Sequence, residues 1–249
     1  MRFMNNEHKL YVTGDTHGED ARFVYEGFGY NRDLKEGDIL FVCGDFGFIG
    51  DDSYHERTYL NYLANEKEYT ICFVDGNHEN FDLINSFPVS EWNGGMVHII
   101  RKNRKGIPKI IHLMRGQVYT IYGKKIFTFG GAYSIDKYMR TPGISWWEQE
   151  MPTDEEMQEG NSNLERHGYK VDYILTHTAP EETMYRYHPN HEHEVRLNNY
   201  LEHVREDTEY KHWYFGHLHR DEDTWRNQTV LWFDVIDMLT GEIVPEDKL

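Results

Sequence analysis

The chain has little cysteine. Only two of its 249 residues are cysteine, Cys43 and Cys72, and each lies inside an apolar run. Two cysteines cannot provide the disulfide framework that small secreted domains use, least of all in a chain of this length. We therefore expect two buried, reduced thiols and a core held together by apolar packing.

Positive charge is also scarce. Lysine and arginine number 26 against 43 aspartates and glutamates, which gives a net charge of −17. A surface of this sign repels the phosphates of a nucleic acid over long range and disfavours a DNA-wrapping protein. A small phosphorylated substrate remains compatible with it, because bound cations would reverse the local field.

Long apolar runs are missing as well. No stretch reaches the roughly 18 residues that a membrane-spanning helix needs, so we expect no membrane association. Residues 1–8 are too few and too polar for a secretory signal, and this favours a cytoplasmic protein. The 39% of hydrophobic residues and the length fit one globular domain over residues 1–249.

A repeated rhythm occupies the first third of the sequence. Apolar runs at 10–12, 39–43 and 70–74 end in Gly14-Asp15, Gly44-Asp45 and Asp75-Gly76-Asn77. Spacings of about 30 residues between the polar ends are typical of βαβ units with a helix in each gap. Because parallel strands end at the same edge of a sheet, we expect these polar residues to converge there.

We predict the remaining elements from alternating apolar residues, helix-capping residues and the glycines that separate strands. Residues 53–67 read as a helix with a Ser53/Glu56 capping box, and 193–206 as another helix. Runs at 109–113, 117–122 and 125–129 indicate antiparallel strands. The runs at 171–175, 212–215 and 229–235 indicate further strands. We interpret the polar residues 134–170 as an insertion or lid over the active edge, with a helix start at Thr153/Glu156, and 245–249 as a loose tail.

Side chains able to bind metals follow five of these runs. They comprise two carboxylates, one amide and five histidines, in the segments Asp15-Thr16-His17, Gly44-Asp45, Gly76-Asn77-His78-Glu79, Thr176-His177 and Gly216-His217-Leu218-His219. A mixed nitrogen and oxygen set suits Zn²⁺, Mn²⁺ or Fe better than Ca²⁺. We expect the preceding glycines to let the backbone turn sharply as each strand ends.

The order of these motifs is similar to that of the calcineurin-like metallophosphoesterase superfamily, and in particular of its small bacterial and phage members. Asp-x-His, Gly-Asp, Gly-Asn-His-Glu, His and Gly-His-x-His occur intact between Asp15 and His219. The resemblance implies a four-layer α/β/β/α sandwich, an α/β fold of two mixed sheets flanked by helices. It also implies hydrolysis of a phosphate ester by a metal-bridging hydroxide.

The resemblance further implies two divalent metal ions, which we expect to be Mn²⁺, with Fe, Zn²⁺ or Ni²⁺ as alternatives. The first ion would be bound by Asp15, His17, Asp45 and His219, and Asp45 would bridge to a second ion bound by Asn77, His177 and His217. His78 would not be a ligand. With Asp45 it would be catalytic, lying beside the substrate phosphate, where Asn77 also contacts the substrate.

The serine/threonine protein phosphatases of this superfamily differ at two positions. Their two phosphate-binding arginines are absent here, where Phe46 follows Gly44-Asp45 and Asp75 precedes Gly76. We therefore favour a small molecule or nucleotide as the substrate, a phosphodiester included. A protein phosphatase, a nuclease with a basic patch of Arg101, Arg104, Lys105 and Arg115, and a metal-bearing scaffold remain alternatives.

Other polar segments have competing interpretations. Lys137 and Arg140 are candidates for substrate contact, while Trp146 and Trp147 are expected to pack. The histidine-rich run 188–193 is either a second metal site or, as we prefer, a solvent-facing cap. We expect the basic run 101–105 to be a solvated loop, and Glu79 and Asp82 to cap or charge the helix that follows them. The oligomeric state is not predicted.

Overall fold

Two β-sheets form the centre of the computed structural model, which describes residues 8–24, 28–189 and 192–245. The strands of the first sheet are β1 (Leu10–Thr13), β2 (Ile39–Val42), β3 (Thr70–Phe73), β4 (Val89–Trp92), β5 (Gly95–Lys102), β6 (Pro108–Leu113), β13 (Val235–Asp237) and β14 (Glu242–Ile243). Those of the second are β7 (Gln117–Ile121), β8 (Lys124–Phe129), β9 (Tyr173–Thr176), β10 (His212–Phe215), β11 (Glu222–Asp223) and β12 (Gln228–Val230). Their spatial orders are β14-β13-β1-β2-β3-β6-β5-β4 and β11-β12-β10-β9-β8-β7.

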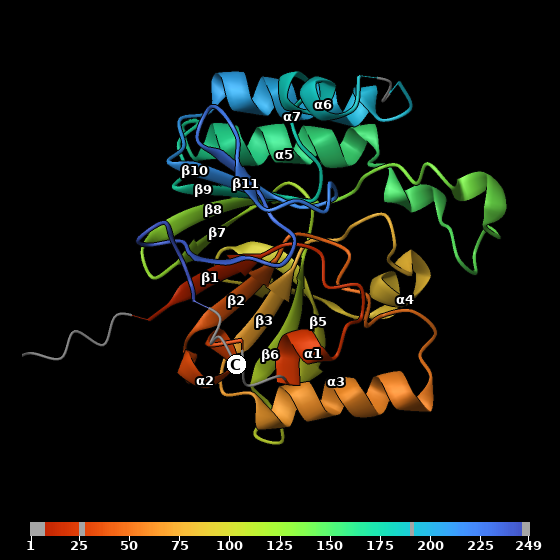
Figure 1. Ribbon diagram of the computed structural model, residues 1–249, viewed down its shortest axis with the longest axis vertical. Coiled ribbons are helices and arrows are strands. Elements are labelled where there is room, and N and C mark those ends of the chain that lie inside the picture. Colours follow the sequence, from red (N-terminus) through yellow and green to blue (C-terminus); the bar gives the residue numbers. More distant parts are fainter. Residues whose placement is uncertain (1–7, 25–27, 190–191, 246–249) are drawn as a thin grey trace, which may run out of the picture.

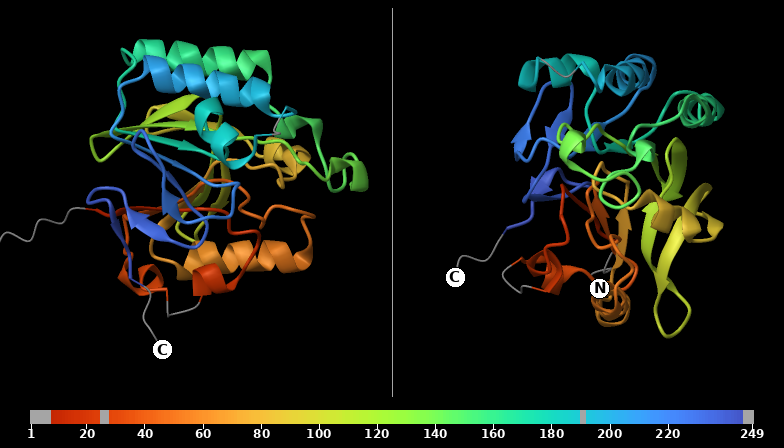
Figure 2. Two further views of the ribbon diagram at one scale, coloured as in Figure 1. Left: turned by 45° about the horizontal axis from the view of Figure 1, so that its top comes forward. Right: turned by 90° about the vertical axis from the view of Figure 1, so that its right-hand side faces the viewer.

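Helices cover the outer face of each sheet (Figures 1 and 2). On the first sheet lie α1 (Ala21–Val24), α2 (Tyr30–Asp33) and α3 (Tyr54–Glu66), with α4 (Phe81–Ser86) near its edge. On the second lie α5 (Asp154–Arg166), α6 (Glu181–Tyr187) and α7 (Val195–Asp207). Both sheets contain parallel and antiparallel pairs, so the expected α/β/β/α sandwich of two mixed sheets is confirmed.

Strand β2 shows how the sequence builds these layers. Ile39, Phe41 and the adjoining Cys43 face the cluster between the sheets, whereas Leu40 and Val42 face the cluster under α3. A strand places alternate side chains on opposite faces, so a continuous apolar run fits a strand covered on both sides. The cluster between the sheets contains both cysteines, which are free and buried as expected.

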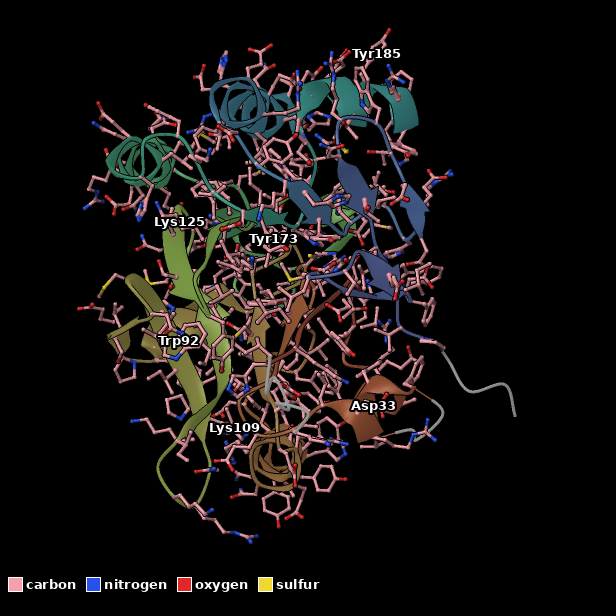
Figure 3. The ribbon with its side chains drawn as sticks, turned by 90° about the vertical axis from the view of Figure 1, so that its left-hand side faces the viewer. Asp33, Trp92, Lys109, Lys125, Tyr173 and Tyr185 are labelled. Carbon is pink, nitrogen blue, oxygen red and sulfur yellow. The ribbon has the colours of Figure 1, made fainter. Side chains whose placement is uncertain are left out.

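The same division holds for the second sheet. Tyr173, on β9, belongs to the cluster between the sheets and points inward in Figure 3, whereas Tyr185 on α6 points outward and is exposed. The neighbouring Ile174 faces α5 and α7 on the other side. Both sheets are therefore rigidly supported from both faces, which fixes the positions of their strand ends.

Helix starts are predicted well by their capping residues. The Thr153/Glu156 capping box at α5 is confirmed, since both reciprocal hydrogen bonds are present. At α3 the side chain of Ser53 caps the helix by accepting from Glu56 N, as predicted. The second hydrogen bond of the predicted capping box, from the Ser53 backbone to Glu56, is not formed. The carboxylate of Glu56 instead accepts from the backbone N–H groups of Gly50 and Asp51.

Strand directions in the middle of the chain depend on contacts that the sequence pattern does not show. The hairpin of β7 and β8 is antiparallel as expected. Strand β6, also expected to be antiparallel only, pairs in parallel with β3 and antiparallel with β5. The reason is that β4 and β5, which were not predicted, lie at the edge of the sheet, and the turn from β5 into β6 brings the chain back beside β3.

Three further predictions differ from the structure. The apolar run 229–235 is not one strand: it divides between β12 in the second sheet and β13 in the first, because the chain crosses between the sheets there. The basic run 101–105 is only partly a loop, since Arg101 and Lys102 end β5. The first gap of the βαβ rhythm contains two short helices, α1 and α2, rather than one.

The polar stretch 134–170 has two distinct parts. Residues 154–166 form α5, which belongs to the outer layer of the second sheet. The irregular part is confined to 134–153, which contains the short 3₁₀ helices η1 (Lys137–Met139) and η2 (Glu148–Glu150) and extends from the body of the sandwich (Figure 1). A lid movement of this segment stays a prediction.

Apart from His8 and Pro245, the residues of the expected polar start and loose tail lie outside the described residues. Within the described ranges, no helix combines the length and the hydropathy that crossing a membrane requires.

Removing the α5 cap tests the capping argument. Thr153→Ala should lower the free energy of unfolding by about 1 kcal/mol, because the amide of Glu156 loses its acceptor. Thr153→Ser retains the hydroxyl and should stay within a few tenths of a kcal/mol of wild type. Urea denaturation measures both variants, and equal stability of the alanine variant and wild type would contradict the assignment.

Candidate metal centre

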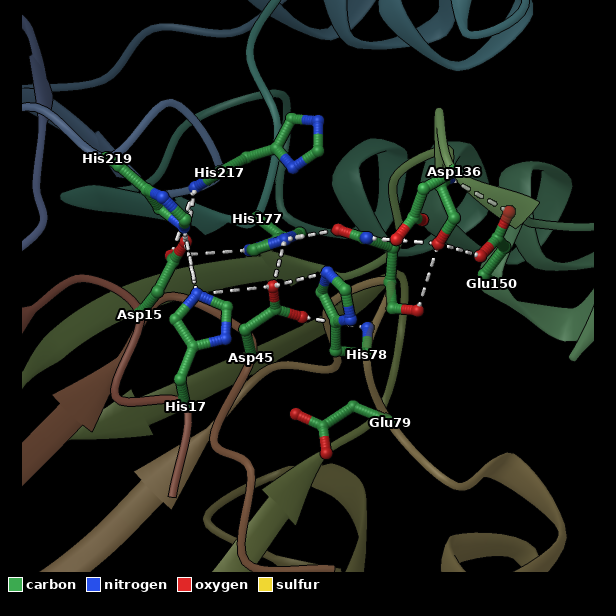
Figure 4. A network of polar contacts seen from close by, with 12 residues as sticks. Asp15, His17, Asp45, His78, Glu79, Asp136, Glu150, His177, His217 and His219 are labelled. Atoms are coloured by element: carbon green, nitrogen blue, oxygen red, sulfur yellow. Dashed lines mark hydrogen bonds and ion pairs between the residues drawn. The ribbon is translucent and has the colours of Figure 1, made fainter. Parts of the chain in front are cut away.

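The polar residues that follow the strands converge at one edge of the sandwich. Asp15, Asp45 and Asn77 come from the ends of β1, β2 and β3 in the first sheet. His177 and the pair His217 and His219 come from the ends of β9 and β10 in the second sheet. Figure 4 shows the two aspartates and the three histidines grouped where the carboxyl ends of the two sheets meet.

One group of donors comprises Asp15, His17 and His219, whose ligand atoms all lie within 4.8 Å of one another. His219 Nε2 is 3.1 Å from Asp15 Oδ2 and 2.8 Å from His17 Nε2. Two ring nitrogens this close to each other and to a carboxylate can share one cation. The group contains three of the four residues expected around the first ion.

A second group comprises Asp15, Asp45 and His177, all fully buried. His177 Nε2 lies 3.5 Å from Asp45 Oδ2 and 3.1 Å from Asn77 Oδ1. The same Asp45 oxygen lies 3.9 Å from His17 Nε2 in the first group. Asp45 Oδ2 thus lies within 3.9 Å of a histidine nitrogen from each group, while Asp15 belongs to both groups, and a carboxylate placed like Asp45 can bridge two ions.

The ring of His177 is oriented by the backbone. Its Nδ1 lies 2.8 Å from the carbonyl oxygen of Cys43, so Nδ1–H donates there and Nε2 faces Asp45 and Asn77, with a proton or an ion between them. Hydrogen bonds of this kind fix the tautomer of a metal-binding histidine. Burial alone would lower the pKa of His177, but the carboxylates of Asp45 and Asp15 raise it to about 10. The centre thus strongly favours a cation.

His217 lies next to the second group, but its Nε2 faces away from the two aspartates. That nitrogen lies 3.4 Å from Glu194 Oε2, and the ring centroid is 5.0 Å from that of His177. Figure 4 shows the ring turned from Asp15, to which the His217 backbone N–H donates instead. Nδ1 is then the nitrogen left for an ion, and the ligand role of His217 stays a prediction.

Glu194 was not predicted. It is buried and accepts from the hydroxyl of Thr178, the amide of Asn198 and the backbone N–H of Tyr133. Burial would raise the pKa of Glu194, but His217 and these hydrogen bonds lower it to about 2. An ionised Glu194 fixes the tautomer of His217. The position of Glu194 in the sequence, directly after the histidine-rich run 188–193, did not indicate this role.

That run itself does not form a metal site among the described residues. His193 stacks on Tyr133, with ring centroids 5.0 Å apart, and His188 lines the cleft beside the metal centre. His191 lies outside the described residues. His188 and His193 are both exposed, as a solvent-facing cap requires, although His188 also lines the cleft.

The glycines before the ligands act mainly through close approach. A Cβ on Gly76 would lie 2.1 Å from Asp45 Oδ1, and one on Gly216 would lie 2.0 Å from Asp15 Oδ1. Neither these two nor Gly14 has a positive φ, so the conformational freedom expected of the four glycines is used only at Gly44, whose φ is 93°. The left-handed backbone falls on ligand candidates instead: His17, Asp45, His217 and His219.

Those four residues store strain. Their φ values lie between 45° and 66°, a region that costs on the order of 1–3 kcal/mol for residues other than glycine. Strain of this kind persists where the surrounding structure holds it and is concentrated at functional sites. Four of the ten non-glycine residues with positive φ in the described part of the chain are thus ligand candidates.

His78 belongs to the site without belonging to either group of donors. Its Nε2 lies 3.9 Å from Asp45 Oδ2 and 3.3 Å from Arg140 Nη2, and its ring lines the cleft. Burial is the largest cause that lowers its pKa, so the ring is neutral. This position agrees with the expected role beside a substrate rather than as a ligand.

The expected roles of Glu79 and Asp82 at the next helix are partly wrong. Glu79 is buried and accepts from the backbone N–H of Phe46, at 2.7 Å, while Asn80 is the residue that caps α4. Burial and the nearby Asp45 raise the pKa of Glu79 to about 8. Asp82 lies in the first turn of α4, as expected, and accepts from the indole of Trp147.

Segment 134–153 brings one of its two candidate cations to the site. Arg140 lines a cleft of about 530 Å³ beside the metal centre, whose wall includes Tyr133, Ile135 and Met184. The ammonium of Lys137 instead lies over the rings of Tyr133 and Trp146, 4.4 and 5.3 Å from their centroids. Lys137 is not among the lining residues, and Trp147 is buried, as a packing role requires.

The basic patch that the nuclease alternative requires beside the metal centre is not formed. Arg115 is buried and pairs with Asp75 and Glu156. Arg104 and Lys105 lie on the β5–β6 hairpin and line a separate hollow with Lys67. These cations are therefore not gathered beside the metal centre.

Comparison with known families identifies the class of protein. The family model described as calcineurin-like phosphoesterase matches residues 8–221, most of the chain. The chain belongs to this family, whose members hydrolyse phosphate esters with divalent metal ions. A search of the curated proteins found no match.

The position of Asp45, next to histidines of both groups of donors, makes it the donor whose loss should matter most. Asp45→Asn should lose at least one ion and nearly all hydrolysis, because a neutral amide cannot offset the repulsion between two cations. Elemental analysis of the purified protein and an assay on an aryl phosphate measure the two effects. Wild-type turnover with both ions retained would refute the bridging role.

Gly76 provides a test that removes no donor atom. Gly76→Ala should displace the carboxylate of Asp45 and lower metal content, since the new methyl group would overlap Asp45 Oδ1. Gly50→Ala is the matched control, because its nearest neighbour, Glu56 Oε2, would be 3.4 Å away. Equal metal content in both variants would show that close approach at Gly76 is unimportant.

Proposed function

We propose that this protein is a dinuclear-metal phosphoesterase that hydrolyses a small-molecule or nucleotide phosphodiester. The observation that supports this substrate most directly is the charge beside the metal centre. Arg140 is the only arginine or lysine among the described residues that line the cleft. Its guanidinium is itself paired with Asp136, through two contacts of 2.8 Å.

Charge distinguishes the substrate classes. A cation that already has a carboxylate partner attracts a doubly charged monoester less than a pair of free arginines would. A diester carries one negative charge and needs less compensation. Arg115 does not replace the missing arginines, because it is buried against Asp75 and lines a different hollow. The wall formed by Tyr133, Ile135 and Met184 suits the organic part of a small ester.

The residues of the site divide the chemistry between them. Two divalent ions, for which we propose Mn²⁺ with Fe, Zn²⁺ or Ni²⁺ as alternatives, would supply a nucleophile near neutral pH and stabilise charge on the phosphate. Asp15, His17, Asp45, Asn77, His177, His217 and His219 would hold them. Asp45 also fixes the loop of His78, since Asp45 Oδ1 accepts from the His78 backbone N–H at 2.9 Å.

His78 and Arg140 act on the substrate side. A guanidinium only donates, so the Nε2 of neutral His78 accepts from Arg140 at 3.3 Å. An anionic phosphate would compete for the guanidinium and leave Nε2 facing the ester. His78 is then placed beside the leaving oxygen, which it would protonate after Nε2 has itself taken up a proton from solvent. The cytoplasmic location and the lid movement of the segment also stay predictions.

The substrate class is tested by the ratio of two rates. With Mn²⁺ present, an aryl phosphodiester should be hydrolysed faster than the matching monoester, with Asp45→Asn as the blank. Arg140→Ala should raise KM for the diester, whereas Arg166→Ala, an exposed arginine paired with Glu159 on α5, should not. A ratio well below one would instead favour a monoesterase, including a protein phosphatase.

His78 is tested separately from the metal ligands. His78→Ala should keep both ions and lose about 10²–10⁴-fold in kcat, the range typical of general acid–base catalysis. Elemental analysis and steady-state kinetics on the same preparation measure the two quantities. Loss of an ion in this variant would show that His78 has been assigned wrongly.

A further inference from the structure

A buried chain of hydrogen bonds runs from Asn77 into segment 134–153. The amide nitrogen of Asn77 donates to Ser134 Oγ at 3.1 Å, and the hydroxyl of Ser134 donates to Glu150 Oε2 at 2.6 Å. The backbone N–H of Ser134 donates to the other oxygen of Glu150 at 3.0 Å. All three side chains are buried, and Figure 4 shows Glu150 at the outer end of this network.

The chain has a fixed direction. Both oxygens of Glu150 receive a hydrogen bond from Ser134, so the residue acts as an acceptor-only carboxylate. The single hydroxyl proton of Ser134 has two acceptors within reach. The carboxylate of Glu150, at 2.6 Å, is nearer than the backbone carbonyl oxygen of Asn77, at 3.4 Å. The lone pairs of Ser134 therefore face the Asn77 side chain and require its NH₂ group, not its oxygen.

An amide side chain can be turned over at little steric cost, but its two ends are chemically opposite. With the Asn77 nitrogen held by Ser134, its oxygen faces the second group, 3.1 Å from His177 Nε2. We propose that Ser134 and Glu150 are positioning residues that hold the Asn77 oxygen towards the second metal ion. This proposal rests on the proposed function, in which Asn77 is a ligand of that ion.

Glu150 is itself anchored beside the metal centre. The buried guanidinium of Arg115 donates to the backbone carbonyls of Gln149 and Glu150 at 2.8 and 3.3 Å. The same guanidinium pairs with Asp75, two residues before Asn77. Segment 134–153 is thus fastened at its base to the loop that follows β3. Because Trp147 is buried and donates to Asp82, any lid movement would be confined to residues 135–146, which carry Arg140.

A purely structural role is the alternative, in which Ser134 and Glu150 only close the base of this loop. The two roles differ in what they do to metal binding. Residues that orient a metal ligand are typically worth about 10–100-fold in metal affinity. A loop closure alone would change stability and leave the second ion as tightly bound as before.

Calorimetric titration of the metal-free protein with Mn²⁺ distinguishes these roles. Ser134→Ala and Glu150→Gln should weaken the second ion by about 10–100-fold and leave the first unchanged. Glutamine has one acceptor oxygen, whereas the backbone N–H and the hydroxyl of Ser134 need two. Glu150→Gln should therefore permit the Asn77 amide to turn over. Ser162→Ala, on helix α5, is the matched control and should bind both ions normally.

A double-mutant cycle tests orientation directly. Asn77→Asp presents oxygen at both ends, so in that background Ser134→Ala should no longer weaken the second ion. If Ser134→Ala folds poorly, the same cycle is made with Glu150→Gln. An equal loss in both backgrounds would overturn the proposal, because the residues would then act through something other than the amide.

Asn77→Ala separates this proposal from the proposed function. If Asn77→Ala leaves both ions bound as in wild type, the ligand set is wrong. If it weakens the second ion while Ser134→Ala and Glu150→Gln do not, the ligand set stands and the positioning role is overturned. Weakening in all three variants supports both.

Discussion

The site depends on two buried carboxylates that each hold together loops from different strands. Asp15, at the end of β1, accepts from the backbone of His217 at the end of β10, which joins the two sheets. Asp45 does the same between β2 and β3 through the backbone of His78. Removing carboxylates from water is costly unless they are paired, and these two are paired with amides, histidine rings and a position for cations.

The close approach of the loops follows from this arrangement. Gly76 and Gly216 pass so near the carboxylates that a side chain would not fit, and the ligand residues themselves adopt the strained left-handed backbone. A rigid sandwich, packed on both faces of each sheet, supplies the support that such strain requires. The fold thus holds the donors in place before any ion or substrate arrives, which lowers the reorganisation needed for binding and catalysis.

Local patterns allowed much of this to be predicted. Each motif is a strand end with its own donors, so Asp15, Asp45 and His177 could be assigned without knowing how the strands pair. The parallel pairing of β6, the division of 229–235 and the role of Glu194 could not, because they depend on contacts between residues far apart in the chain. The link from Asn77 through Ser134 to Glu150 was missed for the same reason.

The central claim is that Asp45 holds two ions side by side. Electron paramagnetic resonance of the protein loaded with two equivalents of Mn²⁺ tests it most directly. Two ions about 3.5–4 Å apart, the separation usual in two-metal sites, should give the signal of an exchange-coupled pair. A spectrum of isolated Mn²⁺ ions, with both equivalents bound, would contradict the account.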